Sequence, residues 1–205
     1  DMLFHIAHQT RYRYSQPVYL VPHEIRLRPR CDWSQRLVDF ALDIDPAPAG
    51  IAYNLDAEGN AATRVWFEGR HPQFCVALRT TVETLRVNPF EFLLEASFDE
   101  LSAGYGEART AVLAPYLLRG DTSGPVVELG GELARQAGGQ VLPFLKGLNA
   151  YIYQSHQAEI RLEGGPLAAE ETLKRGRGSC RDLTVLFIEV CRSLGLAARF
   201  VSGYQ

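Results

Sequence analysis

Apolar and polar side chains alternate with a period of two through about the first 100 residues. This alternation is typical of half-buried β-strands. The clearest apolar series are Phe4, Ile6, Tyr12 and Tyr14, then Val38, Phe40, Leu42 and Ile44, then Phe74, Val76, Leu78 and Val82. We expect the members of the middle series to face one way. Turn sequences rich in Pro, Gly and Asn follow at 46–50, 56–60 and 88–90. Half a dozen strands with turns at this spacing predict an antiparallel sandwich or open barrel.

The period changes after about residue 120. Asp121, Thr122 or Ser123 could cap a helix that ends at Gly138-Gly139. A second helix is predicted over 141–156, a shorter third over 166–174, and a fourth after Ser179. The sequence therefore predicts a β-rich domain at 1–105, a linker at 106–122 and a helical segment at 123–205.

The candidate reactive residues lie at the start of the fourth predicted helix. Ser179 fits the N-cap, and Asp182 stands three residues later, where a capping box places an acid. Cys180 then occupies the first helical position. The residues that follow form an amphipathic stripe: Leu183, Leu186, Phe187, Val190, Cys191 and Leu194. We expect the thiol of Cys180 at the N-terminal end of this stripe, at the mouth of a cleft.

Three features favour the thiolate form of Cys180. The positive end of the helix dipole lies there, the unpaired N–H groups of the first turn offer an oxyanion site, and four basic residues are close in sequence. These are Lys174, Arg175, Arg177 and Arg181. The charge of Asp182 opposes the effect. Spacing alone leaves a nucleophile and an inert, partly buried cysteine equally open.

Several segments resemble the bacterial transglutaminase-like cysteine enzymes, a superfamily of transglutaminases, peptidases and amidases. The resemblance is most specific over 176–204, which includes Gly178-Ser179-Cys180-Arg181-Asp182 and ends in Val201-Ser202-Gly203-Tyr204. Looser similarity to the N-terminal region of these proteins covers residues 8–15, 23–30, 56–60 and 88–90. The resemblance implies an α+β fold: an antiparallel β-sandwich-like domain, then the helical half of a papain/transglutaminase-like core.

The resemblance also implies a role for each candidate site residue. Cys180 would be the nucleophile, with its backbone N–H as an oxyanion donor, and Ser179, Asp182, Arg181 and Arg177 would support it. A peptide or protein amide would be the substrate, attacked to give a thioester that passes to water or to an amine. The residues do not choose between hydrolysis and transamidation. A non-catalytic binding or scaffold module of the same fold is the alternative to the enzyme, which we favour.

The family orders its triad Cys, His, Asp, with the His beyond the position of Gly203-Tyr204. All five histidines of this chain precede Cys180. Without a base, a thiol loses its activation and the proton for the leaving amine. We therefore expect an enzyme interrupted inside its catalytic domain, with little turnover by itself.

Composition narrows the function classes. The net charge of −3 argues against nucleic acid as a partner, and no apolar run approaches the ~20 residues that span a membrane. No signal peptide is evident. The four cysteines lack zinc-site spacing and fit free thiols in a cytoplasmic protein, so no metal and no cofactor are expected. The stripe after Cys180 lacks part of its expected cover, which predicts burial against the β domain or in a homo-oligomer.

Overall fold

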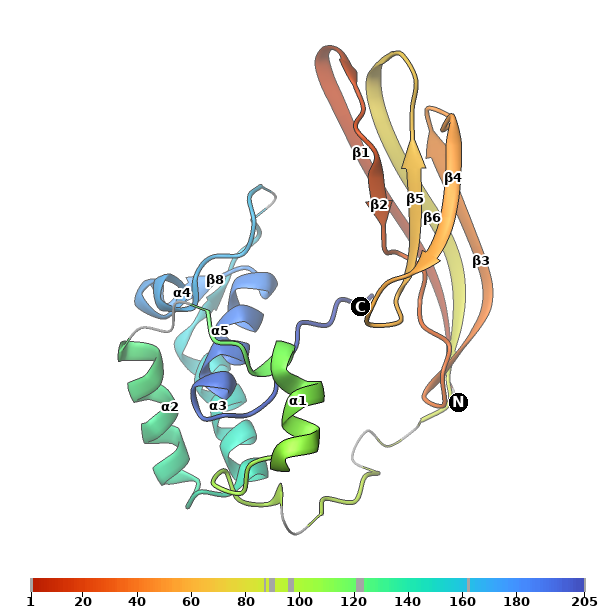
Figure 1. The fold of residues 1–205 in the computed structure, drawn as a ribbon. Helices are drawn as coiled ribbons and strands as arrows, with labels where there is room; N and C mark the ends of the chain where they lie inside the picture. The colour runs from red at the N-terminus through yellow and green to blue at the C-terminus, as the bar shows by residue number, and fades with distance from the viewer. Residues whose placement is uncertain are drawn as a thin grey trace. The chain divides into compact units, whose positions relative to one another are not determined.

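The chain forms two compact units in a computed structural model, which describes residues 2–86, 88, 91–95, 98–120, 124–161 and 163–204. The first unit, here the β unit, comprises Asp1–Phe92 with Gly203–Gln205, and the second, the helical unit, comprises Leu93–Ser202. Figure 1 labels their elements. Antiparallel sheets followed by helices confirm the predicted α+β class.

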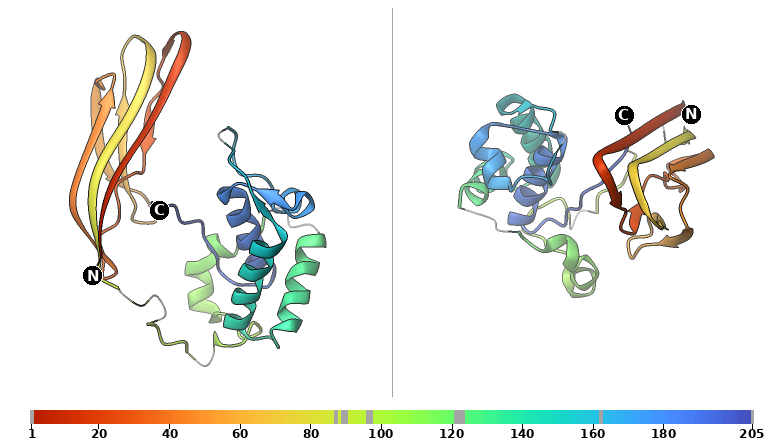
Figure 2. Two further views of the ribbon diagram at one scale, coloured as in Figure 1. Left: turned by 180° about the vertical axis from the view of Figure 1, so that it is seen from behind. Right: turned by 90° about the horizontal axis from the view of Figure 1, so that it is seen from above.

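Two three-stranded antiparallel sheets build the β unit. One has the order β1 (Met2–Tyr19), β6 (Arg70–Thr84), β3 (Gln35–Asp45), and the other β2 (His23–Ile25), β5 (Ala61–Trp66), β4 (Gly50–Leu55). The long strands β1, β6 and β3 run side by side in Figure 2. Buried apolar side chains from both sheets meet in one cluster: Leu20, Ile25, Val65, Phe74 and Val76.

The predicted alternation fails at one position of β3. Leu37 pairs with Val82 and Asp39 pairs with Thr81, so Val38 is the extra residue of a β-bulge. A bulge shifts the faces by one residue, and the Val38 side chain is accordingly 54% exposed. Val38 therefore does not share the face of Leu42 and Ile44, as the sequence pattern had predicted.

Five helices and a small parallel bridge form the described part of the helical unit. The helices are α1 (Gly106–Leu117), α2 (Gly124–Gln136), α3 (Val141–Ser155), α4 (Ala169–Arg175) and α5 (Cys180–Ser193). The bridge pairs β7 (Gln157–Ala158) with β8 (Arg177–Gly178). Helix α1 lies within the segment predicted as a linker, and the proposed caps Asp121, Thr122 and Ser123 lie outside the described residues.

The buried members of the apolar stripe of α5 pack against α2, α3 and α4 of their own unit, and not against the β domain, one of the two partners that the sequence predicted. Burial in a homo-oligomer stays a prediction. Leu186 and Val190 are fully buried, and they share one cluster with buried side chains of α2, α3 and α4: Val126, Leu129, Leu133, Phe144, Leu148, Ile152 and Ala169. Helices α2, α3 and α5 lie side by side in both figures. At Gly130 on α2, a Cβ would stand 2.8 Å from Ser193 Oγ on α5. This packing fixes α5 and thereby the place of Cys180. Among the described residues, no helix has the length and apolar character needed to cross a membrane.

Candidate active site

Helix α5 begins as its sequence predicts. Ser179 is the N-cap in extended conformation, and Ser179 with Asp182 forms the capping box. Cys180 follows as the first helical residue with an exposed side chain. Its carbonyl accepts a hydrogen bond from Thr184 Oγ1 at 2.7 Å, and the first regular bond of the turn runs from Leu183 N to Ser179 O. The thiol thus stands at the positive end of a well-ordered helix.

Asp182, the third residue of α5, has a fully buried side chain. Its Oδ2 accepts hydrogen bonds from the backbone N and the Oγ of Ser179, both at 2.8 Å, and its Oδ1 accepts one from Leu167 N at 2.8 Å. Arg161 donates to both carboxylate oxygens, at 3.0 and 3.2 Å. Burial by itself raises the pKa of Asp182, but the bonds from Leu167, Ser179 and Arg161 outweigh it and hold the pKa well below its ordinary value.

Residues 159–161 and 163–167 include several that bond to the start of α5. Glu159 N donates to Gly178 O at 3.0 Å, which extends the parallel β7–β8 pairing by one residue. Arg181 donates to the carbonyls of Arg161 and Gly164, at 2.9 and 3.1 Å. Together with the bonds that Asp182 accepts, these contacts hold the preceding segment against the residues on either side of Cys180. No local sequence pattern points to Arg161, because it lies 21 positions from its partner Asp182.

Two glycines in front of Cys180 have structural roles. Gly176 ends α4 with φ of +61°, the left-handed conformation that glycine adopts without strain. A Cβ on Gly178 would stand 2.8 Å from the Cβ of Asp182 and 3.3 Å from Thr172 Cγ2. Only a residue without a side chain therefore lets β8 pass this close to the buried carboxylate.

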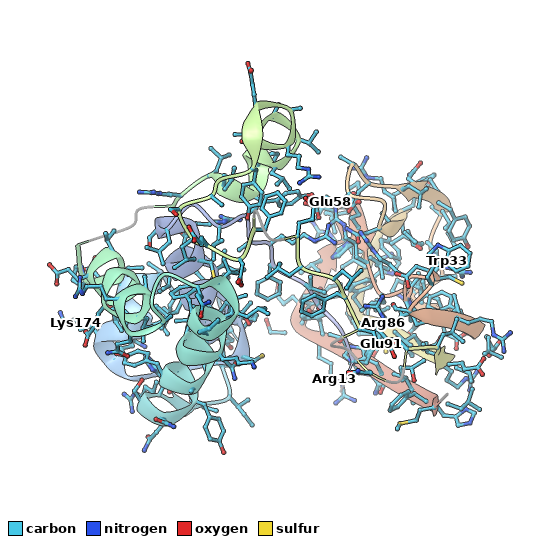
Figure 3. All side chains as sticks on the ribbon, turned by 90° about the horizontal axis from the view of Figure 1, so that it is seen from below. Arg13, Trp33, Glu58, Arg86, Glu91 and Lys174 are labelled. Carbon is cyan, nitrogen blue, oxygen red and sulfur yellow. The ribbon has the colours of Figure 1, made fainter. Side chains whose placement is uncertain are left out.

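The basic residues predicted near the thiol are engaged elsewhere. Arg175 pairs with Glu171 at 2.7 Å, Arg177 lies 3.8 Å from Glu159, and Arg181 donates to backbone carbonyls. Lys174 is exposed at the periphery of the helical unit (Figure 3). Arg175 and Arg177 thus face carboxylates, whereas Arg181 bonds to neutral carbonyls and keeps its full charge one residue from Cys180. The electrostatic support for a thiolate comes from the helix N-terminus and from Arg181.

The four cysteines are all free and differ in exposure. Cys31 and Cys180 are exposed, whereas Cys75 and Cys191 are buried. Burial raises the pKa of Cys191 to about 12, so its thiol stays protonated at neutral pH. Cys31 is therefore the natural internal reference for the reactivity of Cys180.

No described histidine hydrogen bonds to Cys180. His5, His8 and His156 bond to neighbouring hydroxyl groups, and His23 and His71 bond to backbone carbonyls. Burial lowers the pKa of His156, whose Nε2 is buried without a hydrogen-bond partner. Within the described residues, no group of three or more His, Cys, Asp or Glu side chains is placed to hold a metal ion.

A small apolar cavity of about 220 Å³ lies at the far end of α5. Its lining includes Phe98, Leu101, Tyr105, Val141 and Leu196. Because it adjoins the C-terminal end of α5, it is separated from Cys180 by the length of that helix, about 20 Å. This cavity therefore does not belong to the site around the thiol.

Comparisons with known proteins agree with this arrangement. Residues 4–83 match the model of the bacterial transglutaminase-like N-terminal region, and residues 133–205 match the model of the transglutaminase-like superfamily. An "Uncharacterized protein" of Mycobacterium tuberculosis is 27% identical over 98% of this chain, and one of Mycobacterium leprae is 25% identical over 97%. The chain spans 65% and 70% of the length of these two relatives.

A solved structure has the same fold. The crystal structure of "a Putative Cysteine Protease from Cytophaga hutchinsonii" superposes with a TM-score of 0.63 at 17% sequence identity. The match covers 94% of this chain and 66% of that one. It therefore extends over both the β unit and the helical unit.

Proposed function

The chain belongs to the transglutaminase-like superfamily, and we propose that it is part of a cysteine-dependent acyl-transfer enzyme acting on amide bonds through Cys180. The observation that carries the proposal is the exposed thiol at the first position of α5. The hydrogen bonds that Asp182 accepts from Ser179 hold this turn in place. A nucleophilic cysteine needs both access to its substrate and a positive environment for the thiolate, and this position offers both.

The reaction would begin with attack of the Cys180 thiolate on the amide carbonyl carbon. A C–S bond forms, and the carbonyl electron pair moves to oxygen, where first-turn N–H groups, including that of Cys180, can donate to it. The C–N bond then breaks, and the amine leaves with a proton. Water or a second amine attacks the resulting thioester, and the C–S bond breaks to return the thiol.

The proton for the leaving amine needs a donor near Sγ. In the superfamily a histidine carries it, and every histidine of this chain precedes Cys180 and bonds elsewhere. We therefore propose that the base belongs to a part of the whole protein other than these 205 residues. We expect these residues to form an acyl-enzyme with an activated ester but to turn over amides little.

Thiol labelling tests the proposal. Iodoacetamide is added to the native protein at pH 7 and pH 6, and peptide mapping follows each cysteine over time. We expect Cys180 to react first and Cys31, which is exposed but has no helix terminus, to react more slowly. Cys180→Ala should remove the fast phase and Cys31→Ala should leave it. Labelling of Cys31 at the rate of Cys180 or faster would overturn the proposal.

A binding or scaffold module is the second candidate, and the absence of a described histidine bonded to Cys180 favours it. Acylation of Cys180 by an activated ester distinguishes the enzyme from the binding or scaffold module. Incubation with p-nitrophenyl acetate followed by mass analysis should place one acetyl group on Cys180 in the enzyme, and none on that residue in a module without catalysis.

Four free thiols also support our proposal of a cytoplasmic location, because reducing compartments keep cysteines unpaired.

A further inference from the structure

The buried carboxylate of Asp182 lies close to the thiol of Cys180. Its Oδ2 is 2.8 Å from the backbone N of Ser179, the residue directly before the cysteine. Covalent geometry then keeps Oδ2 within roughly 10 Å of Sγ, whichever rotamer the thiol adopts. A negative charge that water cannot reach opposes a thiolate at such a distance. Asp182 by itself is therefore unfavourable for a nucleophile at the start of α5.

Arg161 offsets the charge of Asp182. Its guanidinium donates to both carboxylate oxygens, at 3.0 and 3.2 Å, and its Nη2 also donates to the carbonyl of Gly165 at 2.6 Å. The Arg161 side chain keeps 23% of its surface exposed and that of Asp182 keeps none. Salt screens a pair in such surroundings much less than a surface pair. Arg161 therefore cancels much of the field that Asp182 would exert on the thiol.

Asp182 stays ionised without Arg161, because its other hydrogen bonds come from neutral groups. Burial raises the pKa of Asp182, and the bonds from Leu167 and Ser179 lower it more than the bond from Arg161 does. A carboxylate that accepts two or three such bonds remains charged at neutral pH. Loss of the Arg161 charge would thus leave a buried anion near Cys180, not a neutral acid.

Arg161 also holds a positive charge beside the thiol. Its backbone carbonyl accepts a hydrogen bond from Nη2 of Arg181 at 2.9 Å, and the carbonyl of Gly164 accepts one from Nη1 at 3.1 Å. Both acceptors are neutral, so Arg181 keeps its full charge one residue from Cys180. One residue thereby controls both charged neighbours of the cysteine on α5, the anion through its side chain and the cation through its backbone.

The remaining charged residues around this turn act more weakly. Arg175 pairs with Glu171, and Arg177 lies 3.8 Å from Glu159. The charged residues of α2 and α3, which also pack against α5, are all exposed. Water and salt screen exposed charges. Three further residues near the turn are exposed as well: Glu163, Glu170 and Lys174.

From this geometry we infer that Arg161 is a positioning residue for Cys180, which pairs the charge of Asp182 and holds Arg181 in place so that the thiolate has a net positive neighbourhood. Arg161 acts through these two residues and is therefore not itself a catalytic residue. The inference rests on the proposed function, since it assumes that Cys180 reacts as a thiolate nucleophile.

The pH profile of alkylation tests the inference on the full chain. The rate constant for labelling of Cys180 by iodoacetamide is measured from pH 5.5 to pH 9.5 by peptide mapping, with exposed Cys31 as the internal reference. At high pH the rate constant reports access to the thiolate, and at pH 6 it also reports how much thiolate is present. The ratio of the rate constants at pH 6 and pH 9.5 therefore isolates the electrostatic effect.

Four variants give expected ratios of opposite sign. Arg161→Gln keeps a donor for the carboxylate but loses the charge, and it should lower the ratio about fivefold. Arg161→Lys keeps the charge and should stay within about twofold of the parent chain. Asp182→Asn removes the anion and should raise the ratio about fivefold. The double variant Arg161→Gln with Asp182→Asn should return close to the parent value, because both charges are gone.

Arg192→Gln is the matched control. Arg192 also lies on α5, keeps 18% of its side-chain surface exposed and pairs with Glu189 at 3.3 Å. It stands about 18 Å from Cys180 along the helix axis. Its loss should leave the ratio within about 1.5-fold of the parent chain, even where it destabilises the helical unit. Circular dichroism of each variant verifies that the unit is folded before the rates are compared.

The outcomes separate the inference from the proposed function. An unchanged ratio in Arg161→Gln, or shifts of the same sign in Arg161→Gln and Asp182→Asn, overturns the role of Arg161, since a merely loosened turn would move both variants alike. Where Arg161→Gln does not fold, an unchanged or lower ratio in Asp182→Asn overturns that role. Labelling of Cys180 no faster than Cys31 in the parent chain overturns the proposed nucleophile instead.

Discussion

The turn that joins β4 to β5 and the turn that begins α5 are each built around one aspartate. Asp56 accepts bonds from the backbone N–H groups of Glu58 and Asn60 and from the side chain of Asn60. Asp182 accepts from Ser179, Leu167 and Arg161. Both carboxyl groups have lowered pKa values. The side-chain bond from Asn60 is the main cause of the drop to about 2 at Asp56.

The two turns differ in burial. The Asp56 side chain keeps 20% of its surface exposed, whereas Asp182 is fully buried. Each also binds an arginine far along the chain: Asp56 binds Arg26, 30 positions away, and Asp182 binds Arg161, 21 positions away. Water reaches the carboxylate of Asp56 but not that of Asp182. The same arrangement is therefore solvent-accessible in the β unit and buried in the helical unit.

The largest effect is expected from removing the buried carboxylate. Asp182→Ala leaves Arg161 and two backbone N–H groups without their acceptor, and it should cost about 4 kcal/mol of the helical unit's unfolding free energy. Urea unfolding followed by the far-UV helical signal measures it. Asp56→Ala is the control and should shift the midpoint far less. Equal losses at the two positions would show that burial is not what separates the turns.

Core truncations should each destabilise one unit only. Leu186 is fully buried on α5, and Leu78 is 2% exposed on β6. Either change to Ala should cost about 3 kcal/mol through lost burial and the cavity left behind. Hydrogen exchange with peptide resolution reads each unit separately. Loss of protection in both units from a single truncation would contradict the division into two compact units.

Gly178→Ala should cost about 2 kcal/mol, because the new methyl group would meet Asp182 and Thr172 and force them apart. Thermal unfolding of the variant measures the loss. Gly165→Ala is a suitable comparison, since no atom lies within 4 Å of the Cβ it would gain. A variant at Gly178 as stable as the one at Gly165 would mean that the carboxylate has room to move.

The smallest expected effect is a pH dependence of the Asp182 contribution. The pKa of Asp182 is lower in the folded protein than in the unfolded chain, so its stabilisation is complete above the unfolded value near 4. It is lost progressively as the pH falls further. The difference in unfolding free energy between the parent chain and Asp182→Asn should therefore narrow by about 1 kcal/mol from pH 7 to pH 3. A gap that widens on acidification would have the wrong sign.

Local signals made the start of α5 predictable. The N-cap, the capping box and the apolar stripe depend on residues within a few positions of one another, and Ser179, Asp182 and Leu186 lie where the sequence places them. The exposure of Cys180 was less predictable, because the pattern placed its thiol at the end of the buried stripe, at the mouth of a cleft, and left a partly buried cysteine open. Its role as nucleophile stays a prediction.

Non-local contacts set the limit of the sequence analysis. Arg161 meets Asp182 only because the β7–β8 pairing brings their segments together, and no periodicity marks that pairing in a two-residue bridge. The bulge at Val38 depends on register against β6. Helix α1 has no buried residue, so it lacks the apolar stripe by which the other helices could be found.

The pairing of β1 with β6 imposes an order of events on the chain as it is made. Met2 pairs with Thr84 and Tyr19 with Arg70, so the first strand has no partner until the residues of β6 have left the ribosome. At ordinary synthesis rates that wait is on the order of ten seconds. During it, the backbone edge of β1 stays unpaired. The β unit therefore completes its long sheet only after β6 is made, whereas the helical unit draws its helices from a stretch of about 100 consecutive residues and closes soon after they emerge.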